Sequence, residues 1–179
     1  MFTISDFQAA QKTFAENHEE QKIYSPEKNL LSYELSNLRN YHRGTMVEIM
    51  VADRLLRSGT ECKHIGGKGN PDIEIYSNGQ ILRAEVKSAT LVSGRTYEFS
   101  GVDPDELDNL FLGFIHPTRG LVTRTVAKPH LMRWLQVGGK WGQPIKWSSQ
   151  KDGYSIKFDK DMINSGNIIT AEWNGGPWS

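Results

Sequence analysis

Residues 71–87 of the chain read PDIEIYSNGQILRAEVK. Apolar and polar side chains alternate over 72–76, which is the period of a β-strand, and the last seven residues return as a second strand. Asn78-Gly79 between them is a strong signal for a two-residue hairpin turn. We therefore predict an antiparallel hairpin whose pairing brings Asp72, at the start of the first strand, close to Glu85 in the second.

The charged side chains of this hairpin converge. Residues two apart in a strand share a face, so Glu85 and Lys87 point the same way while Val86 packs behind them. With Asp72 they place two carboxylates and an ammonium at one spot. Carboxylate oxygens suit a hard cation such as Mg²⁺, and the backbone carbonyl of Val86 is available as a further ligand.

A helix is predicted ahead of the hairpin, over residues 45–58, with Gly59 as its left-handed C-terminal cap. Polar residues at 53, 54, 57 and 58 share one side of this helix, and Glu48 falls nearly opposite them among apolar residues. Glu48 is therefore expected to point inward, toward the core.

Pro71-Asp72, followed after twelve residues by Glu85-Val86-Lys87, resembles the motif of the PD-(D/E)xK nuclease superfamily. Glu48 on the preceding helix resembles the further acidic residue of many members. Within the superfamily, Arg43-Gly44 before the helix and Gly69-Asn70-Pro71-Asp72 before the hairpin look most like archaeal Holliday-junction resolvases, and type II restriction endonucleases share the core. The resemblance covers residues 43–90.

The resemblance implies an α/β fold with a restriction-endonuclease-like core, in which a central mixed β-sheet is flanked by helices. It implies Mg²⁺ as cofactor, with Mn²⁺ able to substitute, bound by Asp72 and Glu85 with help from Glu48. Phosphodiester hydrolysis needs an activated water and relief of charge on the phosphate, which such a metal supplies. Because two carboxylates favour the charged form of Lys87, its expected role is to position the water or stabilise charge.

Other segments carry candidate DNA contacts. The loop 66–69 reads GGKG and offers Lys68 to a phosphate, but it is no Walker loop because a strand follows it, which excludes a P-loop ATPase. His64 beside this loop either assists at the site or only packs there. Residues 130–151 contain four cations interleaved with three tryptophans and no acid, which is typical either of a DNA-binding region or of core tryptophans with solvated lysines. The four cations are Arg133, Lys140, Lys146 and Lys151.

The opposite charge gathers over 98–108, which holds five acids and no Lys or Arg. Asp103-Pro104-Asp105-Glu106 within it is expected to be a capped turn, on an edge that faces away from DNA. Further strands are predicted over 61–65, 96–99, 110–115, 121–126 and 154–158, and a helix over 129–135.

The composition bounds the rest of the interpretation. The chain has 179 residues, of which 37% are hydrophobic, and its 21 Lys and Arg balance its 21 Asp and Glu. This predicts one folded domain and argues against a non-specific nucleic-acid coat protein. We expect 1–42 to form an N-terminal helical layer, 43–136 the catalytic core and 137–179 a C-terminal extension. The layer contains predicted helices over 4–20, capped by Ser5 and Asp6, and from Ser25-Pro26 onward.

Cys62 is the single cysteine, so the chain has no internal disulfide and no zinc site with two cysteine ligands. No apolar run approaches the length of a membrane span, and Met1-Phe2-Thr3 begins no signal segment. The expected location is the cytoplasm, without membrane insertion.

These observations predict a Mg²⁺-dependent DNA endonuclease. The extra helices, the C-terminal part and the neutral charge favour sequence-specific cleavage of duplex DNA, as in restriction or homing enzymes, by a homodimer that cuts both strands. The alternatives are a structure-specific Holliday-junction resolvase, a non-catalytic DNA-binding module on a nuclease fold, and an RNA-directed nuclease, since nothing in the sequence tests for recognition of the 2′-hydroxyl.

Overall fold

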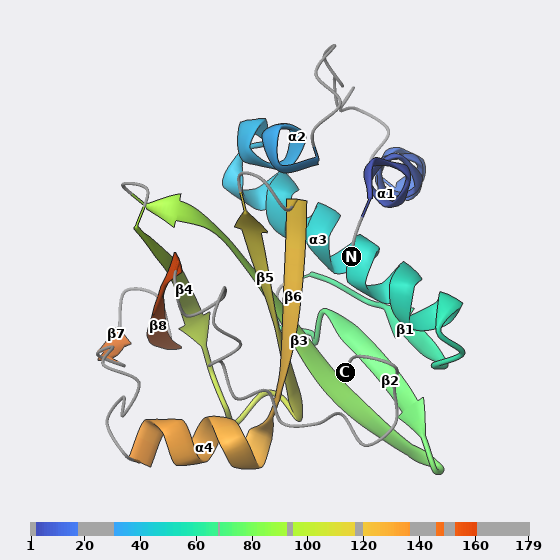
Figure 1. Cartoon of the computed structure of the whole chain (residues 1–179). Coiled ribbons are helices and arrows are strands. Elements are labelled where there is room, and N and C mark those ends of the chain that lie inside the picture. Colours follow the sequence, from blue (N-terminus) through green and yellow to red (C-terminus); the bar gives the residue numbers. More distant parts are fainter. Residues whose placement is uncertain are drawn as a thin grey trace.

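The computed structural model describes residues 3–17, 31–67, 69–92, 95–116, 120–136, 146–148 and 153–160. Helices and strands follow one another along the chain as shown in Figure 1. The helices are α1 (Ile4–Asn17), α2 (Leu31–Asn37), α3 (Asn40–Arg57) and α4 (Lys128–Gln136). The strands are β1 (Cys62–His64), β2 (Ile73–Ser77), β3 (Gln80–Val92), β4 (Thr96–Val102), β5 (Asn109–His116), β6 (Gly120–Ala127), β7 (Lys146–Ser148) and β8 (Gly153–Asp159).

The strands form a mixed sheet in the order β1-β2-β3-β4-β8-β7, and β5 and β6 branch from β3. The pairing of β3 with β5 is parallel, whereas β5 pairs with β6 in antiparallel fashion. The first strands, β1 to β3, are antiparallel neighbours. The structure thus confirms the predicted α/β class with a mixed central sheet.

The predicted hairpin of β2 and β3 is also confirmed. Its turn residues Asn78 and Gly79 have φ angles of 51° and 74°, which a two-residue turn of type I′ requires at both central positions. Ser77 pairs with Gln80 directly across this turn. The second strand is longer than the sequence predicts, because β3 continues to Val92, where it pairs with β4.

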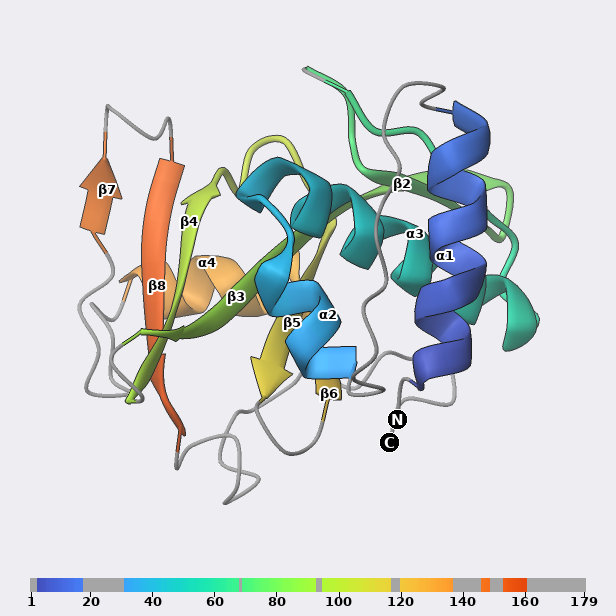
Figure 2. The ribbon, with the colours of Figure 1, turned by 90° about the horizontal axis from the view of Figure 1, so that it is seen from above.

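Helices cover both faces of the sheet. On β5, Phe111 and Ile115 belong to a first hydrophobic core shared with α1, α2 and α3, whereas Leu110, Leu112 and Phe114 belong to a second core shared with α4, β4 and β8. Seen from above, α1, α2 and α3 lie nearer the viewer than the sheet and α4 lies beyond it (Figure 2). The arrangement fits the sequence, because alternate residues of a strand point to opposite faces.

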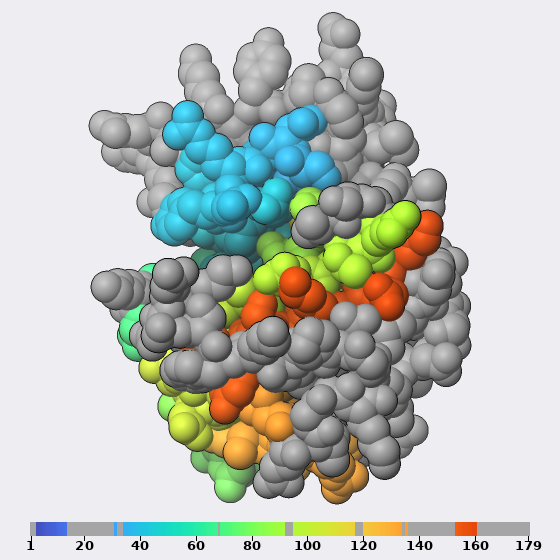
Figure 3. All heavy atoms as spheres, turned by 90° about the vertical axis from the view of Figure 1, so that its left-hand side faces the viewer, coloured from blue at the N-terminus to red at the C-terminus, as the bar shows by residue number. Residues whose placement is uncertain are grey.

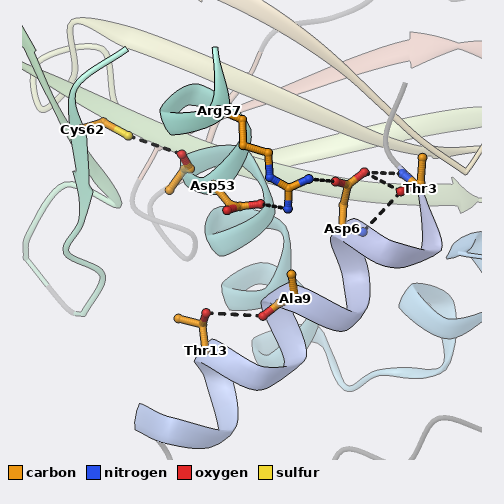
Figure 4. A network of polar contacts seen from close by, with 8 residues as sticks. Thr3, Asp6, Ala9, Thr13, Asp53, Arg57 and Cys62 are labelled. Carbon is orange, nitrogen blue, oxygen red and sulfur yellow. Dashed lines mark hydrogen bonds and ion pairs between the residues drawn. The ribbon is translucent and has the colours of Figure 1, made fainter. Parts of the chain in front are cut away.

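Two polar networks fix the N-terminal helix. Thr3 and Asp6 exchange hydrogen bonds around the first turn of α1, so Thr3 is the cap and the predicted candidate Asp6 is its reciprocal partner, whereas no hydrogen bond among the described residues gives Ser5 this role. Arg57 of α3 contacts both Asp6 of α1 and Asp53 of its own helix, as Figure 4 shows. The buried Phe7 and Ala10 on the inner side of α1 confirm the predicted amphipathic pattern.

Helix α3 begins at Asn40, five residues ahead of the predicted start, and ends before Gly59, whose φ of 83° confirms the predicted left-handed cap. The predicted start of the second helix at Ser25-Pro26 lies outside the described residues. Figure 3 shows α2 and the start of α3 above β4 and β8, with α4 below them. In the part of the chain that the structure describes, no helix combines the length and the apolar character needed to span a membrane.

Candidate active site

Asp72 lies immediately before β2 and faces Glu85 across the hairpin, since the pairing of Ile73 with Ala84 is followed by these two residues. The backbone N–H of Val86 donates a hydrogen bond to Asp72 Oδ2, with a distance of 2.7 Å between the two atoms. The predicted approach of Asp72 to the Glu85–Lys87 segment is therefore confirmed. A residue at a strand start can still move, and this bond holds the carboxylate against β3.

Glu85 and Lys87 lie on the face of β3 opposite to Ala84 and Val86, which belong to the first core. Lys87 Nζ contacts Glu85 Oε1 in an ion pair, and both side chains are about one-quarter exposed, at 25% and 24%. Farther along the same face, Ala89 belongs to the second core. The charged pair thus occupies the stretch of β3 just before the second core covers the strand.

Glu48 reaches the site from α3, and close packing of this helix on the sheet makes that possible. A Cβ atom at Gly113 of β5 would lie only 3.0 Å from Val47 Cγ1 and 3.5 Å from the carbonyl oxygen of Lys87. Glycine at this position therefore lets α3 approach the sheet beside the Lys87 backbone. Glu48, next to Val47, is mostly buried, with 14% of its side chain exposed.

The electrostatics of the site center on Asp72. Burial, followed by the charges of Glu48 and Glu85, raises the pKa of Asp72 from its ordinary 3.8 to about 7. The hydrogen bond from Val86 and the charge of Lys87 act in the opposite direction without compensating for these effects. Three carboxylates therefore lie close enough to repel one another, and one ammonium does not neutralise them.

A site with excess negative charge favours binding of a cation. Within the described residues, no three His, Cys, Asp or Glu side chains are grouped closely enough to hold a metal ion as they stand. Mg²⁺ does not require such a group, because it is bound through one or two carboxylates, several waters and the substrate phosphate. The oxygen donors of Asp72 and Glu85, with Glu48 beside them, fit that ion.

The loop before β2 closes one side of the site. Ile65 N–H and Gly66 N–H both donate to the backbone oxygen of Asp72, at 2.9 and 3.3 Å. His64, at the end of β1, contacts Glu48, a contact that the sequence left open. The pairing of His64 with Ile73, one residue from Asp72, places His64 here, and no pattern within one element of the sequence indicates it. Lys68, the predicted phosphate contact of this loop, lies outside the described residues.

The basic stretch is described only in part. Arg133 is exposed on α4, whose Leu131 packs in the second core, and no described contact joins Arg133 to the site. Lys146 lies in β7, but its side chain lies outside the described part, as do Lys140 and Lys151 entirely. The interpretation of 130–151 as a DNA-binding region thus stays a prediction.

The acidic segment 98–108 forms the predicted capped turn. Asp103 Oδ1 accepts a hydrogen bond from Asp105 N–H, and the Asp103 carbonyl accepts one from Glu106 N–H. Two further acids have cationic partners: Lys157 Nζ lies 3.2 Å from Glu98, and Arg83 Nε lies 3.7 Å from Asp108.

No protein-family model matches the chain, and no curated protein sequence matches it. Among solved structures, it is similar to the 1.6 Å structure of Hjc, a Holliday junction resolvase from the archaeal hyperthermophile Archaeoglobus fulgidus. The superposition covers 69% of this chain and 88% of that one, with 15% sequence identity and a TM-score of 0.41.

Proposed function

We propose that the protein is a divalent-metal-dependent endonuclease that hydrolyses phosphodiester bonds of DNA. The observation that carries the proposal is the convergence of Asp72, Glu85 and Lys87 at one point, with the charge of Glu48 close enough to raise the pKa of Asp72. Two carboxylates on adjacent strands with a lysine two residues farther along form a donor set for a hard cation and a phosphate.

Mg²⁺ bound by Asp72 and Glu85 would supply an activated water and neutralise charge on the phosphate oxygens. Asp72 is held for this task by the N–H of Val86, which leaves its second oxygen available. Glu85 follows Ala84, the last β3 residue that pairs with β2, and itself pairs with Leu110 of β5, so hydrogen-bonded strands hold its backbone. Glu48 is the third carboxylate of the site. The Val86 carbonyl is our proposed backbone ligand.

Lys87 is the cation of this site. It neutralises part of the negative charge by contacting Glu85. With a metal held by Asp72 and Glu85, the Lys87 ammonium would hold the attacking water or the scissile phosphate. Such electrostatic groups contribute about 100- to 1000-fold to rate in comparable sites.

The first substrate to test is branched DNA. Of the residues that resemble junction resolvases, Asp72 belongs to the site, and a Cβ atom at Gly44 would lie 3.7 Å from Glu48 Oε1. The sequence-specific interpretation rests partly on residues 137–179, most of which lie outside the described part. Sequence-specific duplex cleavage therefore becomes our second candidate, supported by the additional helices α1 and α2.

A homodimer follows from the same proposal, because the two strands of a duplex or junction are related by two-fold symmetry and each copy offers one site. The molecular mass in solution, measured with and without DNA, tests this point. A monomeric mass under both conditions would contradict it.

The deciding experiment measures cleavage of a four-way junction, supercoiled plasmid, linear duplex and single-stranded RNA with Mg²⁺ or Mn²⁺, beside the Asp72→Ala variant. We expect metal-dependent cutting of DNA that this substitution abolishes. Cuts at the junction alone support a resolvase, and cuts at one short sequence support a restriction or homing enzyme. DNA binding without cutting of any substrate would identify a non-catalytic module.

A further inference from the structure

His64 and Glu48 form a contact that the catalytic proposal does not use. His64 Nε2 lies 3.1 Å from Glu48 Oε2, and the two side chains are 23% and 14% exposed. A carboxylate can only accept hydrogen bonds, so the contact is a hydrogen bond whenever Nε2 carries the ring proton. The pair links the end of β1 to α3, two elements that are otherwise joined through the first core.

The backbone that carries His64 is tied to Asp72. His64 pairs with Ile73 in the β1–β2 ladder, and the next two backbone N–H groups, of Ile65 and Gly66, donate to the Asp72 carbonyl. His64 therefore occupies a fixed position relative to Asp72, whereas Glu48 lies on a separate helix. A hydrogen bond between them fixes the Glu48 carboxylate relative to the strand that carries His64.

Gly66 packs directly against this pair. Its φ is 60°, and a Cβ atom there would lie 3.4 Å from His64 Nε2 and Cε1 and 3.7 Å from Glu48 Oε2. Gly69, later in the same loop, has a similar φ of 81°, but a Cβ there would meet none of the described atoms within 4 Å. Of the three glycines with positive φ in this loop, Gly66, Gly67 and Gly69, only Gly66 touches the pair among the described residues.

We propose that His64 is a positioning residue, which holds the Glu48 carboxylate toward Asp72 by donating a hydrogen bond from Nε2. Without it, the Glu48 side chain could adopt other rotamers, and the third carboxylate of the site would lose its fixed place. The importance of this positioning for cleavage rests on the proposed function. The positioning itself can be measured through metal binding in the absence of DNA.

The test compares two substitutions of His64 of similar size. His64→Gln keeps an N–H donor with about the reach of Nε2, whereas His64→Leu removes the donor and keeps the volume. We expect Leu to weaken Mg²⁺ binding by about 10-fold, measured by calorimetry on the DNA-free protein, and Gln to stay within about 3-fold of the natural chain. Equal affinities for the Gln and Leu variants would overturn the proposal, whether both bind as the natural chain does or both bind more weakly.

A second comparison shows whether His64 acts through Glu48. In a Glu48→Gln background, His64→Leu should change Mg²⁺ affinity by less than about 2-fold, because the group that it positions is already altered. A full additional loss in that background would mean that His64 acts on the metal by another route and would refute the positioning role. Unfolding of each variant, followed by circular dichroism, shows that it is folded.

The two glycines provide a matched control. Gly66→Ala and Gly69→Ala carry similar backbone strain, so they should lower thermal stability by similar amounts. Only Gly66→Ala should weaken Mg²⁺ binding, because only its methyl group would contact the His64 ring and limit its movement. Equal metal affinities in these two variants would count against a tightly packed pair.

The outcomes for the two proposals are separable. If the natural chain cuts no DNA but His64→Leu still weakens Mg²⁺ binding and His64→Gln does not, the positioning role stands and the nuclease proposal fails. If the natural chain cuts DNA and both variants bind Mg²⁺ and cut as it does, the nuclease proposal stands and the positioning role fails.

Discussion

Two acidic regions of this molecule differ in how their charges are placed. In the 98–108 segment the acids are spread along a turn and a strand, and partners such as Lys157, Arg83 and backbone N–H groups contact Glu98, Asp108 and Asp103. At the site, Glu48 from α3 and Glu85 from β3 lie close to Asp72, which precedes β2, and the pKa of Asp72 rises to about 7. The acidic segment is richer in carboxylates, yet of these two regions only the site buries its carboxylates close enough together to raise the pKa of one of them to about 7.

The comparison teaches that the number of acids along the sequence does not identify a cation site. What matters is convergence from separate elements, burial, and a shortage of cationic partners. The repulsion among the carboxylates is unfavourable without a cation. Binding of a cation relieves this repulsion, which favours binding. The following predictions test that difference, beginning with the largest expected effect.

Removing one carboxylate charge from each region should give the largest difference in cleavage rate between the two regions. Asp72→Asn should lower the rate of metal-dependent DNA cleavage by about 1000-fold or more, because a metal ligand is lost. Asp105→Asn, in the acidic segment, should leave the rate within about 2-fold. Rates of junction and plasmid cleavage under saturating Mg²⁺ measure both. Equal losses would show that overall negative charge, and not the cluster, supports the reaction.

The cations of the two regions should also differ. Lys87→Met should reduce cleavage by about 100-fold while Mg²⁺ binding persists, because an electrostatic group at the phosphate is lost. Lys157→Met removes the cationic partner of Glu98. It should leave the cleavage rate unchanged and alter the free energy of unfolding by no more than about 1 kcal/mol. Single-turnover rates and urea unfolding of both variants make the comparison. A Lys87→Met enzyme with full activity would remove Lys87 from the site.

The free energy of unfolding should depend on pH because of the raised pKa of Asp72. Because the folded-state pKa of Asp72 is raised from 3.8 to about 7, the folded chain holds a proton there that the unfolded chain has released. This contribution therefore lowers stability as the pH rises from about 4 to about 7. Asp72→Asn should raise the free energy of unfolding by about 2 kcal/mol at pH 8 and have little effect at pH 4.

Urea unfolding at both pH values, without metal, provides the measurement. Asp105→Asn is again the control, and its effect on stability should stay within about 0.5 kcal/mol at either pH. A destabilised Asp72→Asn protein at pH 8 would mean that the cluster is better neutralised than its geometry indicates.

The smallest effect is expected at Arg83. Arg83→Gln removes the guanidinium beside Asp108 but retains the backbone N–H of residue 83, which donates to Asp108 Oδ2 at 2.8 Å. The loss should be below about 1 kcal/mol and should shrink further in high salt, as for exposed ion pairs. Thermal unfolding at low and high NaCl concentrations would show it. A loss that salt does not reduce would indicate packing of the side chain, not charge.

The hairpin half of the site could be predicted from the sequence because its determinants are local. Asn78-Gly79 sets the turn, the turn sets the register, and the register places Asp72 beside Glu85. The inward direction of Glu48 followed from helical periodicity in the same way. Each of these inferences needs only the order of residues within one element or one turn.

Features that depend on distant partners were missed. The extension of β3 to Val92 depends on pairing with β4, and the early start of α3 at Asn40 has no capping side chain at Arg39 to announce it. The contact of His64 with Glu48 joins residues sixteen positions apart across a helix and a strand. The close packing of Gly113 on Val47 likewise depends on the tertiary structure alone.

The shared strand β3 has a consequence for the order in which the molecule folds. Its antiparallel pairing with β2 closes through a two-residue turn, which takes microseconds, whereas its parallel pairing with β5 must wait for the intervening β4 to fold back. Asp72 and Glu85 should thus meet early, and Glu48 should join them only when α3 docks on the sheet. Pulsed hydrogen exchange during refolding should protect β2–β3 amides before β3–β5 amides.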